Sequence, residues 1–190
     1  MPKKTKTELS IGRVLGRGGF CVVNEITKIT LRETTGEPAE LEPTAGNAMY
    51  TNNIVQDRPF MQANCIRKGK DFRYAIKRLQ DTCHKDAGTF INGINDLDIE
   101  FRFLSVVRHP NIIKMRAVES GSPFDTRFFV VVDRLYDILG TRLAQWKKKD
   151  LKGARRLLDR DGKKENALMA ERLTVAYDLS CALKYLHQLK

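Results

Sequence analysis

The sequence predicts an α+β protein, in which a five-stranded antiparallel sheet with one helix is followed by the first helices of a mainly helical part. Two observations predict this order. Short runs of apolar and β-branched residues recur up to residue 133, and apolar residues at helical spacing dominate after it. The chain has 190 residues, of which 42% are hydrophobic and 8% aromatic, so it has the composition of a protein that buries a core.

The first two strands are predicted in residues 9–30, where a glycine-rich turn separates two runs of apolar and β-branched residues. In residues 31–70 the composition changes to Gly, Pro, Asn, Thr and charged residues. Pro38, Pro43 and Pro59 are spaced so that no long regular element survives between them. We therefore interpret residues 31–70 as a long insertion between strands.

The third strand is predicted in residues 72–79, FRYAIKRL. A helix follows in residues 95–109 and ends before Pro110, because proline disfavours helical geometry in the residue before it. The helical spacing is carried by Leu97, Glu100, Phe101, Leu104 and Val107. Two further runs, in residues 111–120 and 127–133, predict the last two strands of the sheet.

Two helices are predicted after residue 133, in residues 137–149 and 167–190. Residues 147–165, between them, hold nine Lys or Arg and four Asp or Glu, and are interpreted as a basic insertion. The predicted organisation is thus a sheet-containing domain over residues 1–132, followed by a connector and an incomplete helical domain over residues 133–190.

The charge balance, 34 Lys and Arg against 23 Asp and Glu, gives a net charge of +11, which suits a polyanionic partner. The basic insertion makes nucleic-acid binding an alternative, but a weaker one, because only the nearby Trp146 offers an aromatic ring for base stacking. The four cysteines form no CxxC pair, which argues against a zinc ribbon or a disulfide-stapled scaffold. The chain starts without a secretory signal, and its longest apolar run is too short to span a membrane. We expect an intracellular protein, cytoplasmic or nuclear, without a membrane partner.

Four groups of residues carry candidate chemistry. The glycine-rich turn has so little side chain that backbone N–H groups are able to approach phosphate oxygens. Lys77, on the third strand, points the same way as Ala75 and reaches toward such a phosphate. Glu100, on the following helix, is a candidate ion-pair partner for Lys77. The end of the last strand, at Val132 and Asp133, exposes backbone groups that suit the edge of an adenine.

Taken singly, each of these features has an ordinary structural explanation: a plain turn, a surface lysine, a solvated helix glutamate and a strand end. In this order, however, they resemble the N-terminal lobe of a eukaryotic protein kinase of the serine/threonine type. Gly16, Gly18 and Val23 match its G-x-G-x-x-G-x-V pattern, and Ala75 to Lys77 match V-A-I-K. The resemblance continues through an H-P-N turn at residues 109–111, the strand and hinge FFVVVDRL, and the helix DLSCALKYLHQLK. It covers nearly the whole chain apart from the two insertions.

The resemblance implies an ATP-dependent phosphotransferase acting on Ser or Thr hydroxyls of an unidentified protein substrate, with Lys77 and Glu100 in catalytic roles. It implies that Lys77 contacts the α and β phosphates, that Glu100 holds Lys77, and that Val23 and Ala75 enclose the adenine. The resemblance also implies that Val132 is the gatekeeper residue, immediately before the hinge. The full set of residues implied to bind ATP is Leu15, Gly16, Arg17, Gly18, Gly19, Phe20, Val23, Ala75, Lys77, Val132, Asp133 and Leu135.

The chain departs from the family pattern in two places. Cys21 stands where the family has its third glycine, which restricts the loop backbone without forbidding phosphate binding. The catalytic loop H-R-D-L-x-x-x-N and the D-F-G motif, which bind Mg²⁺ in the family, do not occur in these 190 residues. We therefore expect a truncated kinase domain that is inactive alone and has no metal ligands of its own. The alternative is a pseudokinase-like module that binds nucleotide, or docks a partner, without phosphotransfer.

Overall fold

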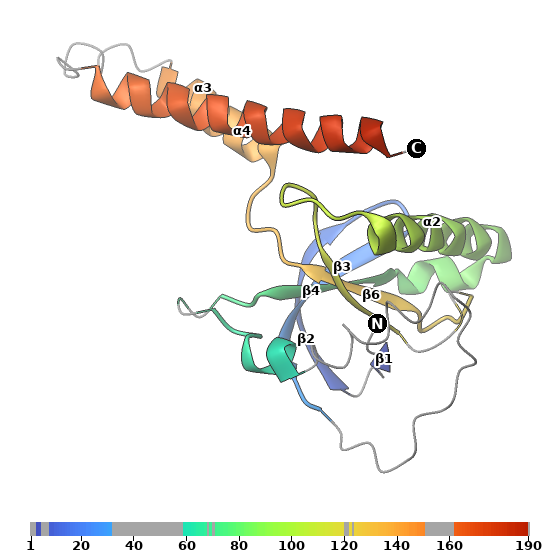
Figure 1. Ribbon diagram of the computed structural model, residues 1–190. Helices are drawn as coiled ribbons and strands as arrows, with labels where there is room; N and C mark the ends of the chain where they lie inside the picture. Colours follow the sequence, from blue (N-terminus) through green and yellow to red (C-terminus); the bar gives the residue numbers. More distant parts are fainter. Residues whose placement is uncertain are drawn as a thin grey trace. The chain divides into compact units, whose positions relative to one another are not determined.

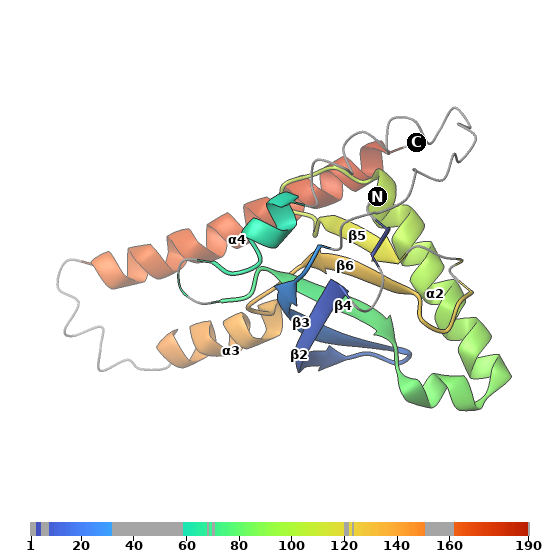
Figure 2. The same cartoon turned by 90° about the horizontal axis from the view of Figure 1, so that it is seen from below.

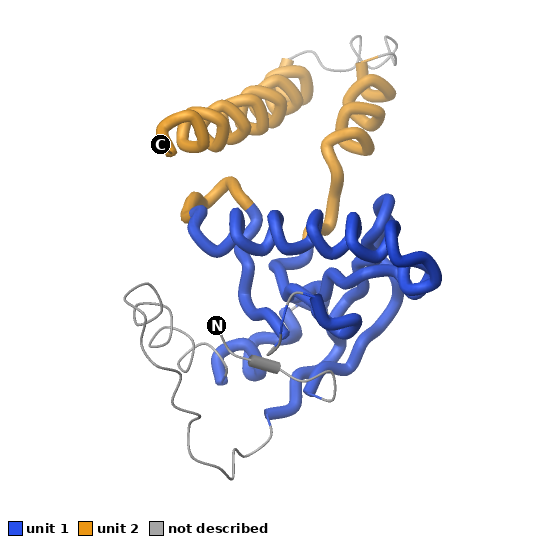
Figure 3. Tube along the Cα trace, turned by 90° about the vertical axis from the view of Figure 1, so that its right-hand side faces the viewer, with its two compact units in different colours: residues 1–107, 113–134 blue, residues 108–112, 135–190 orange. Residues whose placement is uncertain are grey.

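The computed structural model describes residues 3–4, 8–31, 59–67, 69, 71–119, 122, 124–150 and 162–189. The chain divides into two compact units (Figure 3). The first unit comprises Met1–Val107 and Ile113–Arg134, and the second comprises Arg108–Ile112 and Leu135–Lys190. The predicted α+β class is confirmed.

The first unit is built on one sheet (Figures 1 and 2), with strand order β1-β5-β6-β4-β3-β2. Its strands are β1 (Lys3–Lys4), β2 (Leu9–Arg17), β3 (Cys21–Ile29), β4 (Tyr74–Leu79), β5 (Met115–Glu119) and β6 (Phe129–Asp133). Strands β2 to β6 pair antiparallel, as predicted. The prediction missed β1, which pairs parallel with β5 as a sixth strand. Two residues are too few to produce a periodic pattern in the sequence.

Strand alternation gives the sheet two distinct faces. Lys77 has Val23 and Val130 as its cross-strand partners, so these three side chains lie on one face, called here the Lys77 face. Ile76 has Val131 as a partner, and both belong to the opposite face, called the Ile76 face. Residues adjacent in sequence therefore serve different sides of the sheet.

The Ile76 face carries the main buried cluster of the first unit. Met61 and Cys65, 1% and 4% exposed, belong to this cluster although both lie inside the predicted insertion 31–70. Residues 59–63 are helical, while residues 32–58 of that predicted insertion lie outside the described residues. The end of the segment is therefore part of the core rather than an addition to it. The cluster contains Leu9, Ile26, Ile29, Met61, Cys65, Tyr74, Ile76, Ala117, Phe129 and Val131.

The predicted helix is present as α2 (Ala87–Val106), but it begins earlier than predicted and ends three residues before the predicted end, since Val107 already has an extended backbone. Asp86 caps its N-terminus by accepting a 2.6 Å hydrogen bond from the N–H of Thr89. The first two turns contain two glycines and several β-branched residues, which favour helix only weakly, so spacing alone did not reveal them. The 3-10 helix η2 (Asp81–Lys85) connects β4 to α2.

The second unit contains α3 (Leu139–Asp150) and α4 (Lys163–Gln188), which correspond to the two predicted helices. The predicted strand 111–120 begins only at Met115, because residues 108–112 form a turn that belongs to this unit. The Tyr185 hydroxyl accepts a 2.9 Å hydrogen bond from the N–H of Arg108. Asn111 donates to the backbone carbonyl of Asp178 at 3.0 Å. These bonds attach the turn to α4.

Residues 151–161, the middle of the predicted basic insertion 147–165, lie outside the described residues. Across the described ranges, none of the helices is long and apolar enough to cross a membrane.

Candidate functional site

The glycine-rich turn connects β2 to β3 at one end of the sheet. The N–H of Gly18 donates to the carbonyl of Cys21 at 2.8 Å, which closes the turn. Gln80, just after β4, supports it from the side: its Nε2 donates to the carbonyl of Gly18 at 2.8 Å, and its N–H donates to that of Phe20 at 2.9 Å. Cys83 also donates to the Phe20 carbonyl, at 3.3 Å. No sequence pattern predicts that Gln80 anchors this turn, because its partners lie about sixty positions away.

The glycines of the turn are not explained by packing. A Cβ atom placed on Gly16 or Gly19 would meet no protein atom within 4 Å. Among the described residues, Gly162 is the glycine with a positive φ. The backbone conformation of Gly16 and Gly19 therefore does not require glycine either. The fold itself therefore leaves room for side chains at both positions. Glycine there suits a ligand that approaches the backbone closely.

Lys77 and Glu100 form an ion pair between β4 and α2. Lys77 lies in the middle of β4, and Glu100 lies in the second half of α2, the helix that their ion pair places on this side of the sheet. The two side chains keep 23% and 34% of their surface exposed. The pair is thus accessible to a ligand instead of being sealed in the core. The structure brings together the two residues that the sequence analysis placed in catalytic roles.

A cleft of about 520 Å³ opens between the glycine-rich turn and Lys77. Two of its residues, Cys21 and Asp96, were not among the predicted binding residues. Asp96 lies four positions before Glu100, one turn earlier on the same side of α2, so the helical spacing alone could have indicated it. The cleft is lined by Gly16, Arg17, Gly18, Gly19, Phe20, Cys21, Val23, Lys77 and Asp96.

Cys21 is 4% exposed, and this burial disfavours the reactive thiolate form of its side chain. Burial raises the pKa of Cys21 to about 11, although the nearby Lys77 ammonium acts in the opposite direction. The thiol therefore stays protonated at neutral pH. At the position of the family's third glycine, Cys21 serves as a small packed side chain.

Five predicted binding residues do not line this cleft: Leu15, Ala75, Val132, Asp133 and Leu135. Ala75 and Val132 are cross-strand partners on the Lys77 face, buried to 2% and 7% exposure. The Asp133 carboxylate accepts two 2.8 Å bonds from Arg116 on the Ile76 face. Leu135 belongs to the second unit and is 66% exposed. The cleft thus gathers the residues predicted for phosphate binding together with Val23, while the other residues predicted for the base lie outside it, on β4, on β6 and in the second unit.

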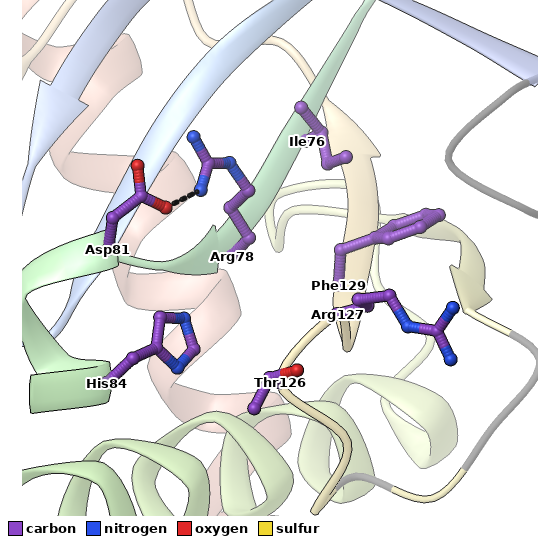
Figure 4. Close-up of a pocket in the computed structure, with 7 residues that line it drawn as sticks. All are labelled: Ile76, Arg78, Asp81, His84, Thr126, Arg127 and Phe129. Atoms are coloured by element: carbon purple, nitrogen blue, oxygen red, sulfur yellow. Dashed lines mark hydrogen bonds and ion pairs between the residues drawn. The ribbon is translucent and has the colours of Figure 1, made fainter.

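Figure 4 shows a second pocket, of about 340 Å³, which contains no predicted site residue. It lies on the Ile76 face, and its charged groups are largely paired within the protein. Arg78 bonds Asp81 at 2.8 Å, and Arg127 bonds Asp125 at 3.1 Å. These internal pairs leave little charge for a ligand. The lining residues are Ile76, Arg78, Asp81, His84, Thr126, Arg127 and Phe129.

The chain matches no known protein-family profile, and no curated protein matches its sequence. The antiparallel sheet with α2, followed by helices, is compatible with the N-terminal lobe of the kinase family that the sequence resembles. Within the described part of the chain, no group of three or more His, Cys, Asp or Glu side chains is arranged to hold a metal ion.

Proposed function

We propose that this chain is the ATP-binding part of a protein kinase that phosphorylates Ser or Thr hydroxyls. The observation that carries the proposal is the Lys77–Glu100 ion pair at the cleft under the glycine-rich turn. A lysine held by a carboxylate keeps its ammonium in one place, where it is able to bind phosphate oxygens without reorganising.

The residues of the cleft fit a triphosphate. Gly16 and Gly19 have open space around their Cα atoms, so that phosphate oxygens could approach the backbone. Lys77 supplies positive charge below the turn, and Glu100 orients it. ATP itself would provide the γ-phosphoryl group for transfer; the described residues bind and orient the nucleotide.

Binding is tested by measuring the thermal stability of the chain with and without ATP. A ligand at about 100 times its Kd stabilises the folded state by ~2.7 kcal/mol, so saturating ATP should raise the Tm clearly. Lys77→Met should abolish this rise. Lys28→Met is the matched control, because Lys28 is an exposed lysine on β3 that does not line the cleft, and it should keep the full response.

Two results would contradict the proposal. One is a wild-type protein that melts at the same temperature in millimolar ATP. The other is a Lys77→Met variant that responds to ATP as the wild type does. Because the catalytic-loop and D-F-G motifs do not occur in these 190 residues, we also expect no transfer of phosphate to a peptide by this chain alone.

A further inference from the structure

A buried ion pair lies on the Lys77 face, at the far end from the glycine-rich turn. Glu25 on β3 is the cross-strand partner of Ala75, which in turn partners Val132 on β6. These three residues form a row across the sheet, two positions along from Lys77. Arg134 directly follows β6 and forms an ion pair with Glu25, with Nη1 3.0 Å from Oε2.

The pair differs from most surface ion pairs in its burial. The Arg134 and Glu25 side chains are only 7% and 9% exposed. The Glu25 carboxylate also accepts bonds from the N–H and the Nε of Arg13, both at 3.3 Å. One carboxylate therefore joins β2, β3 and the end of β6.

The sequence of β2 is adapted to this carboxylate at Gly12. A Cβ atom at Gly12 would lie 2.7 Å from Cγ and 2.8 Å from Oε1 of Glu25. The register of β2 against β3 also shifts between Ile11 and Val14, around the point where Arg13 directs its N–H to Glu25. The absence of a side chain at Gly12 leaves space for the Glu25 side chain beneath β2.

Arg134 is held by its backbone as well as by its side chain. Its N–H donates to the carbonyl of Arg73 at 2.8 Å, which extends the β4–β6 ladder past the end of the strand. The N–H of Asp133 donates to the carbonyl of Lys114 at 3.0 Å. The first compact unit ends at Arg134. The chain is thus fixed up to the residue before Leu135.

We propose that Glu25 and Arg134 are positioning residues for the base of the nucleotide. They hold the end of β6 in line with Ala75, so that the backbone of Asp133 and Arg134 is presented to the adenine edge. This inference rests on the proposed ATP binding and adds to it a pair that fixes the base end of the site. A buried ion pair often contributes little net stability compared with apolar residues of similar size, so stability alone gives a weak reason for placing one here.

The test compares ATP with inorganic tripolyphosphate, which has the phosphates without the base. The double variant Glu25→Met with Arg134→Met removes both charges together and leaves neither one buried alone. We expect it to weaken ATP binding about tenfold or more, and to change tripolyphosphate binding by less than about twofold. Calorimetric titration well below the Tm of each variant gives both constants. Arg134→Lys, which keeps the charge but loses the planar fork, should weaken ATP binding to a smaller extent.

Arg127→Met is the matched control. It breaks an arginine–carboxylate pair with Asp125, which lies before β6 and involves no predicted binding residue, so both ligands should bind as to wild type. Wild-type ATP affinity in the double variant would overturn the inference, as would an equal loss of both ligands. If the double variant does not fold, unchanged ATP binding by Arg134→Lys overturns it. A wild-type protein that binds neither ligand refutes the ATP proposal itself, whereas an effect of Arg127→Met equal to that of the double variant refutes only the positioning role.

Discussion

The two faces of the sheet are built from the same strands but differ in nearly every physical property. On the Ile76 face a cluster of apolar side chains is buried, and Met61 and Cys65 help to close it. On the Lys77 face the same strands present an exposed ion pair, a cleft and a buried ion pair. The comparison shows that alternation separates the buried apolar cluster from the candidate ligand site at a resolution of one residue. Ile76 and Lys77 are neighbours in the chain and should respond to substitution in opposite ways.

The largest effect is expected from the apolar face. Ile76→Ala removes a side chain that is 1% exposed in the centre of the buried cluster. Such a truncation loses transfer free energy and leaves a cavity, so the free energy of unfolding should fall by about 2–5 kcal/mol. Urea denaturation measures this change. ATP affinity of the folded fraction should remain that of the wild type, and a loss of affinity without a loss of stability would contradict the division between the faces.

A smaller loss is expected at Gly12. Gly12→Ala forces a methyl group against Glu25 and Thr27, so overpacking should lower the free energy of unfolding by about 1–3 kcal/mol. Gly16→Ala is the matched substitution on the same strand. With nothing within 4 Å, it should change the free energy of unfolding by less than about 0.5 kcal/mol. Equal losses at the two positions would show that Gly12 is not required by the Glu25 side chain.

The sequence predicted the Lys77 face better than the Ile76 face, for a physical reason. The glycine-rich turn is recognisable from its own few residues. Lys77 and Glu100 lie in a strand and a helix whose apolar residues recur at a clear period. Met61 and Cys65 lie in a stretch rich in Gly, Pro and polar residues, where no period indicates burial. Only the folded sheet brings them to Tyr74 and Ile76.

The buried pair could not be predicted for a related reason. Glu25 and Arg134 are 109 positions apart in the chain, and both belong to residue types that are usually exposed on the surface. Their contact requires the registers of β3, β4 and β6 to be correct at the same time. One residue of slip on β3 would move Glu25 to the other face. The same dependence on tertiary register explains why Gln80 was missed as an anchor of the glycine-rich turn.

On the Lys77 face, stability should hardly respond to loss of the ion pair. Lys77→Met breaks a pair whose partners are 23% and 34% exposed, and such pairs contribute about 0–1 kcal/mol. The free energy of unfolding should therefore change by less than about 1 kcal/mol, while ATP binding is lost. Urea denaturation of Lys77→Met beside Ile76→Ala makes the comparison directly. A destabilisation of Lys77→Met as large as that of Ile76→Ala would mean that the pair is a structural element and would weaken its assignment to the nucleotide site.

The Lys77 face also predicts a low reactivity of the Cys21 thiol. Because burial raises its pKa from 9.0 to about 11, the thiolate fraction near pH 8 should be roughly 100-fold below that of an unperturbed cysteine. Alkylation by iodoacetamide, followed at this position by peptide mass mapping, should be slow and should accelerate as the pH rises toward 11. The same shift makes the free energy of unfolding depend on pH. The stabilisation from the protonated Cys21 thiol is fully present below pH 9 and is lost as the pH rises from 9 to about 11.

Cys21 also reports on its neighbour across the cleft. The Lys77 ammonium lowers the pKa of Cys21, so Lys77→Met should raise that pKa further and slow alkylation of Cys21. Lys28→Met, which removes a lysine outside the cleft, should leave the rate unchanged. Faster alkylation in Lys77→Met would indicate that the Lys77 side chain shields the thiol sterically more than it acts by charge. Rapid alkylation of the wild type at neutral pH would mean that Cys21 is not a buried, packed side chain.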